Sequence, residues 1–204
     1  MAAAATLFMD HGYRATTMEA VAAAAGLSKP AVYYHFRDKG SLFVAAARLV
    51  FARATAATES ILAQPRPLRD RLQAIAATVF SLPQPFTVFD AMMHEARTEL
   101  TAAQAGAIRQ AEDALAQLVE RVLLQAAEHG EIRSEDPVLV AHGFLALLRV
   151  GQARDEKGRR RFPDTERTAA RVVGTLWDGI DPGGGQQGQC PPPDGGRRRA
   201  AGAT

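Results

Sequence analysis

Residues 16–42 read TTMEAVAAAAGLSKPAVYYHFRDKGSL, and this stretch decides the fold. Thr16 and Glu19 stand at the spacing of a capping box, which predicts the start of a short helix. Gly26 occupies the place of a C-terminal cap, where the backbone φ is positive and glycine is favoured. Ser28 is a good N-cap for a second helix. Two short helices joined by a tight turn predict a helix-turn-helix unit.

The second helix of this unit should cover roughly residues 29–35, with Pro30 tolerated in its first turn. We expect Val32 and Phe36 to face inward and Leu27 to pack beneath the turn. The residues expected on the outer face are Lys29, Ala31 and Tyr34. A short helix that is basic and aromatic outside and apolar inside can lie in the major groove of DNA.

The segment from Gly26 to Leu42 resembles the signature of TetR-family transcriptional regulators, where a helix-turn-helix ends in a Tyr-x-His-Phe-x-x-Lys run. The matching residues here are Tyr33, His35, Phe36 and Lys39. The resemblance covers about the first 50 residues, and the remainder is similar to the family only in length and helical pattern. It implies an all-α fold, in which an N-terminal three-helix helix-turn-helix domain is followed by a helical ligand-binding and dimerisation domain.

The resemblance implies that several residues of the motif contact DNA phosphates. Thr17, Tyr33 and His35 would do so, and Lys39 at the start of the next helix would pair with a further phosphate. Each has a structural alternative. Tyr33 could serve mainly in packing, and His35 could cap its own helix.

Base edges would be approached by the outer face of the second helix. The methyl group of Ala31 suits a thymine methyl, and Lys29 and Tyr34 can reach polar edges. The alternative for Lys29 is a solvated surface charge. The full set expected at DNA is Thr17, Ser28, Lys29, Pro30, Ala31, Tyr33, Tyr34, His35 and Lys39.

The N-terminus departs from the family pattern, which begins with a basic arm and a full first helix. Here the chain opens as MAAAATLFMDHGY, so the first helix is expected to have lost its start. Leu7 and Phe8 would still brace the helix-turn-helix, and Gly12 would end the helix. This departure leaves an alternative function open, a helical binding or scaffolding protein whose truncated head no longer binds DNA.

Composition narrows the class of protein. The 204 residues are 47% hydrophobic, which is enough for a core, and they contain no run of 18 apolar residues, so no membrane span is predicted. The lone cysteine, Cys190, fits a reducing compartment, and the cytoplasm is the expected location. The net charge of +2 is weak support for DNA binding, whereas charge placement within the helix-turn-helix is better support.

The rest of the chain is predicted to be helical up to about residue 180. Hydrophobic periodicity and proline breaks predict helices at 38–63, 68–82, 86–99 and 105–129, another from residue 137 onward, and a last one at 165–178. Residues 181–204 are rich in Gly and Pro and are expected to be disordered. The predicted domains are therefore 1–45 for DNA binding, 46–180 for effector binding and dimerisation, and 181–204 as a tail.

A small effector and a second copy of the chain are the expected partners besides double-stranded operator DNA. The residues predicted for an apolar, adaptable effector pocket are Phe80, Phe86, Phe89, Met92 and Met93, with Arg97 to orient a polar group. The residues predicted for a homodimer interface are Phe144, Leu148, Val173, Leu176 and Trp177. For both sets the alternative is that the side chains only complete the core of one chain.

Enzyme activity is not expected. The sequence has no His-x-x-x-His or Glu-x-x-His pair for a metal site in a helical bundle, and no glycine-rich phosphate loop. No metal and no cofactor is therefore predicted. The predicted function is a regulator, in the family's common mode a repressor, that a bound effector shifts toward a conformation unable to hold its operator.

Overall fold

The computed structural model describes residues 1–180, and within them every element is a helix apart from one isolated bridge between Arg154 and Arg160. The helices are α1 (Ala2–Ala15), α2 (Met18–Ala24), α3 (Lys29–His35), α4 (Lys39–Leu62), α5 (Leu68–Ser81), α6 (Phe86–Ala96), α7 (Ala102–Glu128), α8 (Pro137–Gly151) and α9 (Thr165–Trp177). The predicted all-α fold is confirmed. The tail predicted to be disordered, with Cys190, lies outside the described residues.

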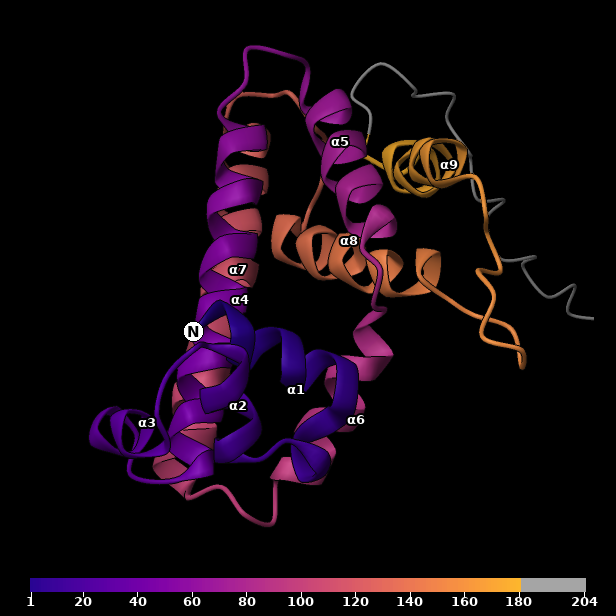
Figure 1. The fold of residues 1–204 in the computed structure, drawn as a ribbon. Coiled ribbons are helices and arrows are strands. Elements are labelled where there is room, and N and C mark those ends of the chain that lie inside the picture. The colour runs from indigo at the N-terminus through magenta and orange to yellow at the C-terminus, as the bar shows by residue number, and fades with distance from the viewer. Residues whose placement is uncertain (181–204) are drawn as a thin grey trace, which may run out of the picture.

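The long helices α4 and α7 lie side by side along the molecule, with α1, α2 and α3 at one end and α5, α8 and α9 at the other (Figure 1). Buried apolar side chains form two clusters along this axis. The first, here called the core cluster, joins α5, α7, α8 and α9 around Leu72, Phe80, Leu123 and Phe144. The second, the head cluster, lies around Phe8, Tyr13 and Phe43.

The head cluster takes residues from both predicted domains. Met92 and Ala96 of α6 and Ile108 of α7 are buried in it beside residues of α1–α4. The predicted boundary at residue 45 falls inside α4, which contributes to both clusters. For brevity, residues 1–45 are called the head below.

The first helix is complete enough to brace the head. It begins at Ala2 and is interrupted at Gly12, whose backbone is non-helical with φ 80° and ψ 173°. Phe8 is 1% exposed, and its ring centroid lies 5.0 Å from that of Phe43 in α4. Leu7 packs against the same cluster, so the expected bracing is confirmed.

The capping box predicted at Thr16 is wrong, because the neighbouring threonine caps α2. The Ala20 amide donates to Oγ1 of Thr17 at 3.1 Å. The Thr16 hydroxyl is buried and donates to the Gly12 carbonyl oxygen at 2.8 Å, where it closes the last turn of α1. Two adjacent threonines both fit a cap by sequence, and only the direction of the preceding helix separates them.

The turn and the second helix follow the prediction more closely. Gly26 has φ +67° and ends α2, while Ser28 caps α3 by accepting from the Ala31 amide at 3.3 Å. The turn does not cover Leu27, which is 51% exposed rather than packed beneath it.

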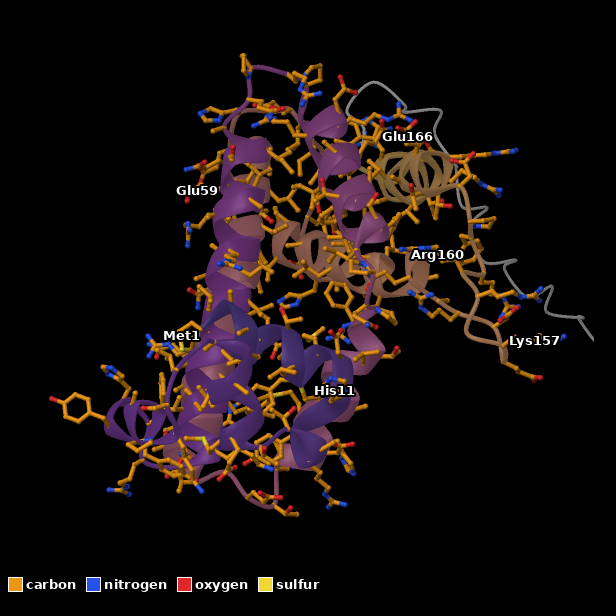
Figure 2. The ribbon with its side chains drawn as sticks, in the orientation of Figure 1. Met1, His11, Glu59, Lys157, Arg160 and Glu166 are labelled. Atoms are coloured by element: carbon orange, nitrogen blue, oxygen red, sulfur yellow. The ribbon has the colours of Figure 1, made fainter. Side chains whose placement is uncertain are left out.

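Helix α4 is long and apolar enough to cross a membrane by length and composition, and the pair α5 and α6, bent by 64°, passes the same test together. Leu42, Phe43 and Ala46 of α4 are nonetheless buried against other helices of the chain. Its charged residues Arg48, Arg53 and Glu59 are exposed, and Glu59 points away from the bundle (Figure 2). The apolarity of α4 is therefore that of a core helix.

Candidate nucleic-acid interface

The outer face of α3 carries most of the residues predicted to contact DNA. Tyr34 is 86% exposed, and its ring meets that of His35 edge-on at 5.2 Å. Tyr33 is also exposed, whereas Val32 is buried in the head cluster. Ala31 is half-buried and not exposed as predicted, because it lies on the side of α3 that turns toward the head. The helix therefore offers a polar, aromatic surface on a fixed apolar base.

Lys29 is exposed and forms an ion pair with Glu19. Its Nζ lies 2.5 Å from Oε1 of Glu19 in α2, and the two side chains are 58% and 52% exposed. The Lys29 ammonium holds the pKa of Glu19 below its usual value, and Glu19 raises the pKa of Lys29. A phosphate or base edge must compete with Glu19 for this ammonium.

Thr17 and the next helix flank the outer face of α3. The Thr17 hydroxyl accepts from the Ala20 amide at 3.1 Å, and its hydrogen bond to the Glu19 carboxylate helps to lower the pKa of Glu19, so a phosphate must compete with Glu19 for this hydroxyl. Ser28 and Pro30 occupy the first turn of α3 and are exposed, where they shape its approach to a ligand.

Lys39 is half-buried at the first position of α4. Its Nζ lies 4.3 Å from the ring centroid of Tyr13 and donates to the Arg14 carbonyl oxygen at 3.4 Å. Tyr13 is 1% exposed, and burial together with the nearby Glu99 carboxylate raises its pKa to about 12. Lys39 thus supports the turn after α1 as well as standing near the predicted phosphate path.

The residues predicted for an effector pocket are divided between the two clusters. Phe80 is buried in the core cluster, and Phe86 packs against that cluster beneath the Arg149 guanidinium at 5.3 Å. The other apolar members, Phe89, Met92 and Met93, belong to the head cluster or pack against it. Arg97 is exposed beyond the end of α6.

A small void lies beside two of these pocket residues. Phe89 and Met92 line it with residues of α1 and α4, and its volume is about 10 Å³. That is room for little more than one water molecule. In this structure, these side chains act as core.

Three of the residues predicted for the dimer interface lie inside the chain itself. Phe144, Leu148 and Val173 are 0%, 3% and 0% exposed within the core cluster, so they have no surface to offer a partner. Leu176 and Trp177 are half-buried against the same cluster. Helix α8 is apolar on several faces, so its buried and exposed residues look alike in sequence, whereas α9 has a single apolar face that packs against the core cluster.

Other residues of α8 form the exposed apolar face that sequence reasoning missed. Leu139 is 67% exposed and Val150 is 53% exposed. Val150 also lines a groove of about 500 Å³ between α8, α9 and residues 161–164, and its rim carries Arg161, Arg167 and Arg171. The surplus of large apolar residues in α8 was the signal that could have found this face.

Gln152, the C-cap of α8, was also missed. It is 4% exposed, its Nε2 donates to the Val79 carbonyl oxygen at 2.7 Å, and its Oε1 accepts from the Phe86 amide at 2.9 Å. One side chain therefore joins the end of α5 to the start of α6. No local pattern marks a glutamine for this role.

Arginines of the loop between α8 and α9 hold the same junction. Arg154 donates to the Pro83 carbonyl oxygen at 2.8 Å, and Arg160 donates to the carbonyl oxygens of Phe80 and Leu82. Lys157 lies at the tip of this loop, and Arg160 lies nearer the helices (Figure 2). The bend between α5 and α6 is thus fixed from the α8 side. Among residues 1–180, no group of three or more His, Cys, Asp or Glu side chains could hold a metal ion.

Comparison with known proteins places this geometry in a family. Residues 1–46 match the family model described as bacterial regulatory proteins, tetR family. The match contains the turn at Gly26 and the whole of α3, which are the features that build the exposed face described above.

Residues 1–46 are a TetR-family segment.

A curated relative is the HTH-type transcriptional activator FasR of Mycolicibacterium smegmatis (strain ATCC 700084 / mc(2)155). It is 33% identical over 78 residues, which are 38% of this chain and 36% of that protein. The match thus spans about a third of the length of the relative, so this sequence similarity is a statement about part of each protein.

Solved structures show that the whole described chain has the TetR-like fold. A putative TetR-family regulator from Mesorhizobium loti MAFF303099 has a TM-score of 0.71 at 23% identity, over 88% of this chain and 93% of that chain. AibR, solved in complex with isovaleryl coenzyme A and operator DNA, has a TM-score of 0.58 at 25% identity, over 86% and 94% of the two chains.

Proposed function

We propose that this chain is a DNA-binding transcriptional regulator that docks α3 in the major groove of an operator. The observation that carries the proposal is the outer face of α3, where exposed Tyr33, Tyr34 and His35 stand beside Lys29 on a helix fixed by Val32. Such a face can donate hydrogen bonds to phosphates and base edges. The similar AibR was solved with operator DNA, which supports the same partner for this chain.

The regulator would act as a homodimer, because a helix-turn-helix that recognises a symmetric operator needs two copies about one turn of DNA apart. The exposed residues Leu139 and Val150 on α8, and the groove beside α9, support this face as the contact between subunits. Two residues of the predicted dimer interface, Leu176 and Trp177, remain partly accessible to a partner. The other three, Phe144, Leu148 and Val173, are buried and would hold α8 and α9 in place within one subunit.

The effector would be a small molecule with an apolar part, and acyl-coenzyme A esters are the first class to test. AibR was solved with isovaleryl coenzyme A, which supports this class. The proposed pocket residues are Phe80, Phe86, Phe89, Met92, Met93 and Arg97, on α5, α6 and the residue after α6. A ligand would have to separate α6 from its neighbours, since Phe89 and Met92 border only a small void. This displacement is the proposed origin of operator release.

The direction of regulation has two candidates. Repression relieved by the effector is the family's common mode and is our first proposal. Activation is favoured by one observation, the naming of the similar Mycolicibacterium protein as a transcriptional activator. A reporter fused to the operator separates the two, because deleting the regulator raises expression in the first case and lowers it in the second.

The family assignment favours a regulator over an enzyme, and a cytoplasmic location is proposed because such a protein must reach DNA. The alternative of a scaffolding protein with an inactive head is less well supported. Residues 1–46 match the family model, and Phe8 braces the head as expected.

The decisive experiment is fluorescence anisotropy of the full chain with labelled DNA from the region flanking its own gene, against scrambled DNA, over a salt series. Sequence-selective binding that weakens with salt is expected, because phosphate contacts release counterions. Equal affinity for the two DNAs would overturn the proposal. Isovaleryl coenzyme A is then added at saturating DNA occupancy, with free coenzyme A as the control for the acyl part.

A further inference from the structure

Two glycines of the head lie directly beneath polar side chains of the helical core. Gly12 has φ +80°, and a Cβ atom there would lie 3.2 Å from Oε2 of Glu95 in α6. A Cβ atom at Gly40 would lie 2.9 Å from Nε2 of Gln104 in α7. A real Cβ atom is rarely found this close to another atom, so only glycine fits well at either position. Glu95 and Gln104 therefore lie against the backbone of the head at these points.

The same two side chains also form hydrogen bonds to the head. The Arg14 amide donates to Oε2 of Glu95 at 3.3 Å. Gln104 donates from Nε2 to Oδ1 of Asp38 at 3.3 Å. Each point therefore combines a close approach with a polar contact, and neither rests on apolar packing alone.

Gln104 is held in place by the local structure of α7. Its Oε1 accepts from the Thr101 amide at 2.9 Å, as part of the capping box that begins α7. Asp38 is held in turn, since its Oδ1 accepts from the Ser41 amide at 2.6 Å at the start of α4. This contact joins the capped starts of two helices and has little freedom to shift.

The positions of the two contacts enclose the helix-turn-helix. Gly12 and Arg14 lie near the end of α1, shortly before α2, and Asp38 is the N-cap of α4, shortly after α3. On the core side, Glu95 is in the last turn of α6 and Gln104 is in the first turn of α7, on either side of the α6–α7 connection. A shift of α6 relative to α7 would move the two ends of the helix-turn-helix by different amounts and so would rotate it.

We propose that Glu95 and Gln104 are positioning residues for DNA recognition, which fix the angle of the head on the helical core. In a dimer, that angle sets the separation and tilt of the two α3 helices, and hence whether both enter successive major grooves. The inference deepens the proposed function and rests on it. In this proposal, Glu95 and Gln104 pass a shift between α6 and α7 on to the helix-turn-helix, although neither side chain contacts DNA or belongs to the proposed effector pocket.

The test compares Glu95→Ala, Gln104→Ala and the double variant with the matched controls Asp113→Ala and Gln110→Ala, all in the full chain. Both control residues are exposed on α7. Asp113→Ala removes a carboxylate, as Glu95→Ala does, and Gln110→Ala removes an amide, as Gln104→Ala does. Two quantities are measured: the affinity for operator DNA over a salt series, and amide hydrogen exchange across residues 1–45 without DNA.

Loss of either contact is expected to weaken operator affinity by about three- to tenfold, the scale of one hydrogen bond, while the salt slope stays as in the controls. An unchanged slope separates a misplaced head from a lost phosphate contact. Amide exchange in α2 and α3 should become faster. The midpoint of global thermal unfolding should equal that of the control variants.

Affinities equal to those of the controls would overturn the inference. So would a loss of affinity that only follows a lower unfolding midpoint, since this indicates a stability effect. If the wild-type chain binds no DNA selectively, the proposed function fails separately. Hydrogen exchange then still decides whether Glu95 and Gln104 hold the head, and unchanged exchange in α2 and α3 would exclude it.

Discussion

At the scale of single residues, the side chains of the α3 surface differ in what they must give up to reach DNA. Tyr34 is almost fully exposed, and its ring contacts that of His35, so the side chain leaves no buried environment when it reaches DNA. Lys29 must leave Glu19, with which it forms a direct ion pair. We therefore expect Glu19, which is outside the set of residues proposed to contact DNA, to influence the strength of DNA binding.

Replacing Glu19 by Gln is expected to strengthen binding to all DNA sequences. The substitution frees the Lys29 ammonium and removes a negative charge near the phosphates, so the slope of log affinity against log salt should steepen by up to about one unit. The measurement is anisotropy over a salt series. An unchanged or weaker affinity would mean that Glu19 holds Lys29 in its DNA-binding position.

Tyr34→Ala is expected to change base preference without changing stability. The side chain is 86% exposed, so its removal should alter the free energy of unfolding by no more than about 0.5 kcal/mol. Selection of bound sequences from a random pool measures the preference, with urea unfolding as the stability control. Identical preferences for variant and wild type would remove Tyr34 from the residues that contact bases.

Alkaline pH should destabilise the protein through Tyr13, whose pKa is raised to about 12. The fold favours the neutral phenol, so this contribution is complete below about pH 10 and is lost as pH rises towards about pH 12. The loss should reach at most about 3 kcal/mol. Urea unfolding across this range measures it, and Tyr13→Phe, which keeps the ring, should flatten the dependence. An equally steep dependence in Tyr13→Phe would assign it to another group.

At the scale of helices, the local sequence predicted the ends of a helix correctly wherever a capping residue or a proline marks them. The ends of α3, α4 and α9 agree with the prediction to within about one residue, because Ser28, Asp38 and Asp164 cap them as their sequence context indicates. Pro65 and Pro83 lie just beyond the ends of α4 and α5. Gly130, which follows the end of α7, has φ +73°, a conformation that glycine favours.

Contacts between distant segments could not be predicted in the same way. Periodicity separates the inner from the outer side of a helix, but α8 is apolar on both, so Phe144 and Leu139 look alike in sequence. The role of Gln152 depends on Val79 and Phe86, which are more than 60 residues away. The candidate DNA-binding surface was predictable because α2, the turn and α3 are adjacent in the chain.

Gln152→Leu is expected to destabilise the chain by about 1–3 kcal/mol. The substitution leaves the Phe86 amide without its partner and removes a hydrogen bond to the Val79 carbonyl oxygen. Urea unfolding measures the change, with Gln125→Leu on the exposed face of α7 as the control. A change as small as that of the control would show that water replaces the glutamine at this junction.

At the scale of the whole molecule, the proposed subunit contact predicts how assembly responds to charge. Val150→Arg would add a cation to a groove that already carries Arg161, Arg167 and Arg171. Like charges forced together in an interface repel, so the dimer dissociation constant should rise at least about tenfold. Analytical ultracentrifugation measures it.

Leu124→Arg is the matched control for this substitution, since Leu124 is a partly exposed leucine on α7, away from the groove. Its dimer should keep the wild-type dissociation constant. Equal weakening by both substitutions, or by neither, would place the subunit contact elsewhere.

The sharing of the head cluster between the two parts of the chain has a consequence for protein engineering. Chimeric regulators are made by grafting one DNA-reading module onto another sensor, with the junction after the third helix. Here such a junction would remove Phe43 and Ala46 of α4 from the head, together with Met92, Ala96 and Ile108, and all five belong to its buried cluster. The head therefore cannot be transferred alone with its buried cluster intact. A working graft must carry the matching surfaces of α6 and α7 with it, or the recipient must be redesigned to supply them.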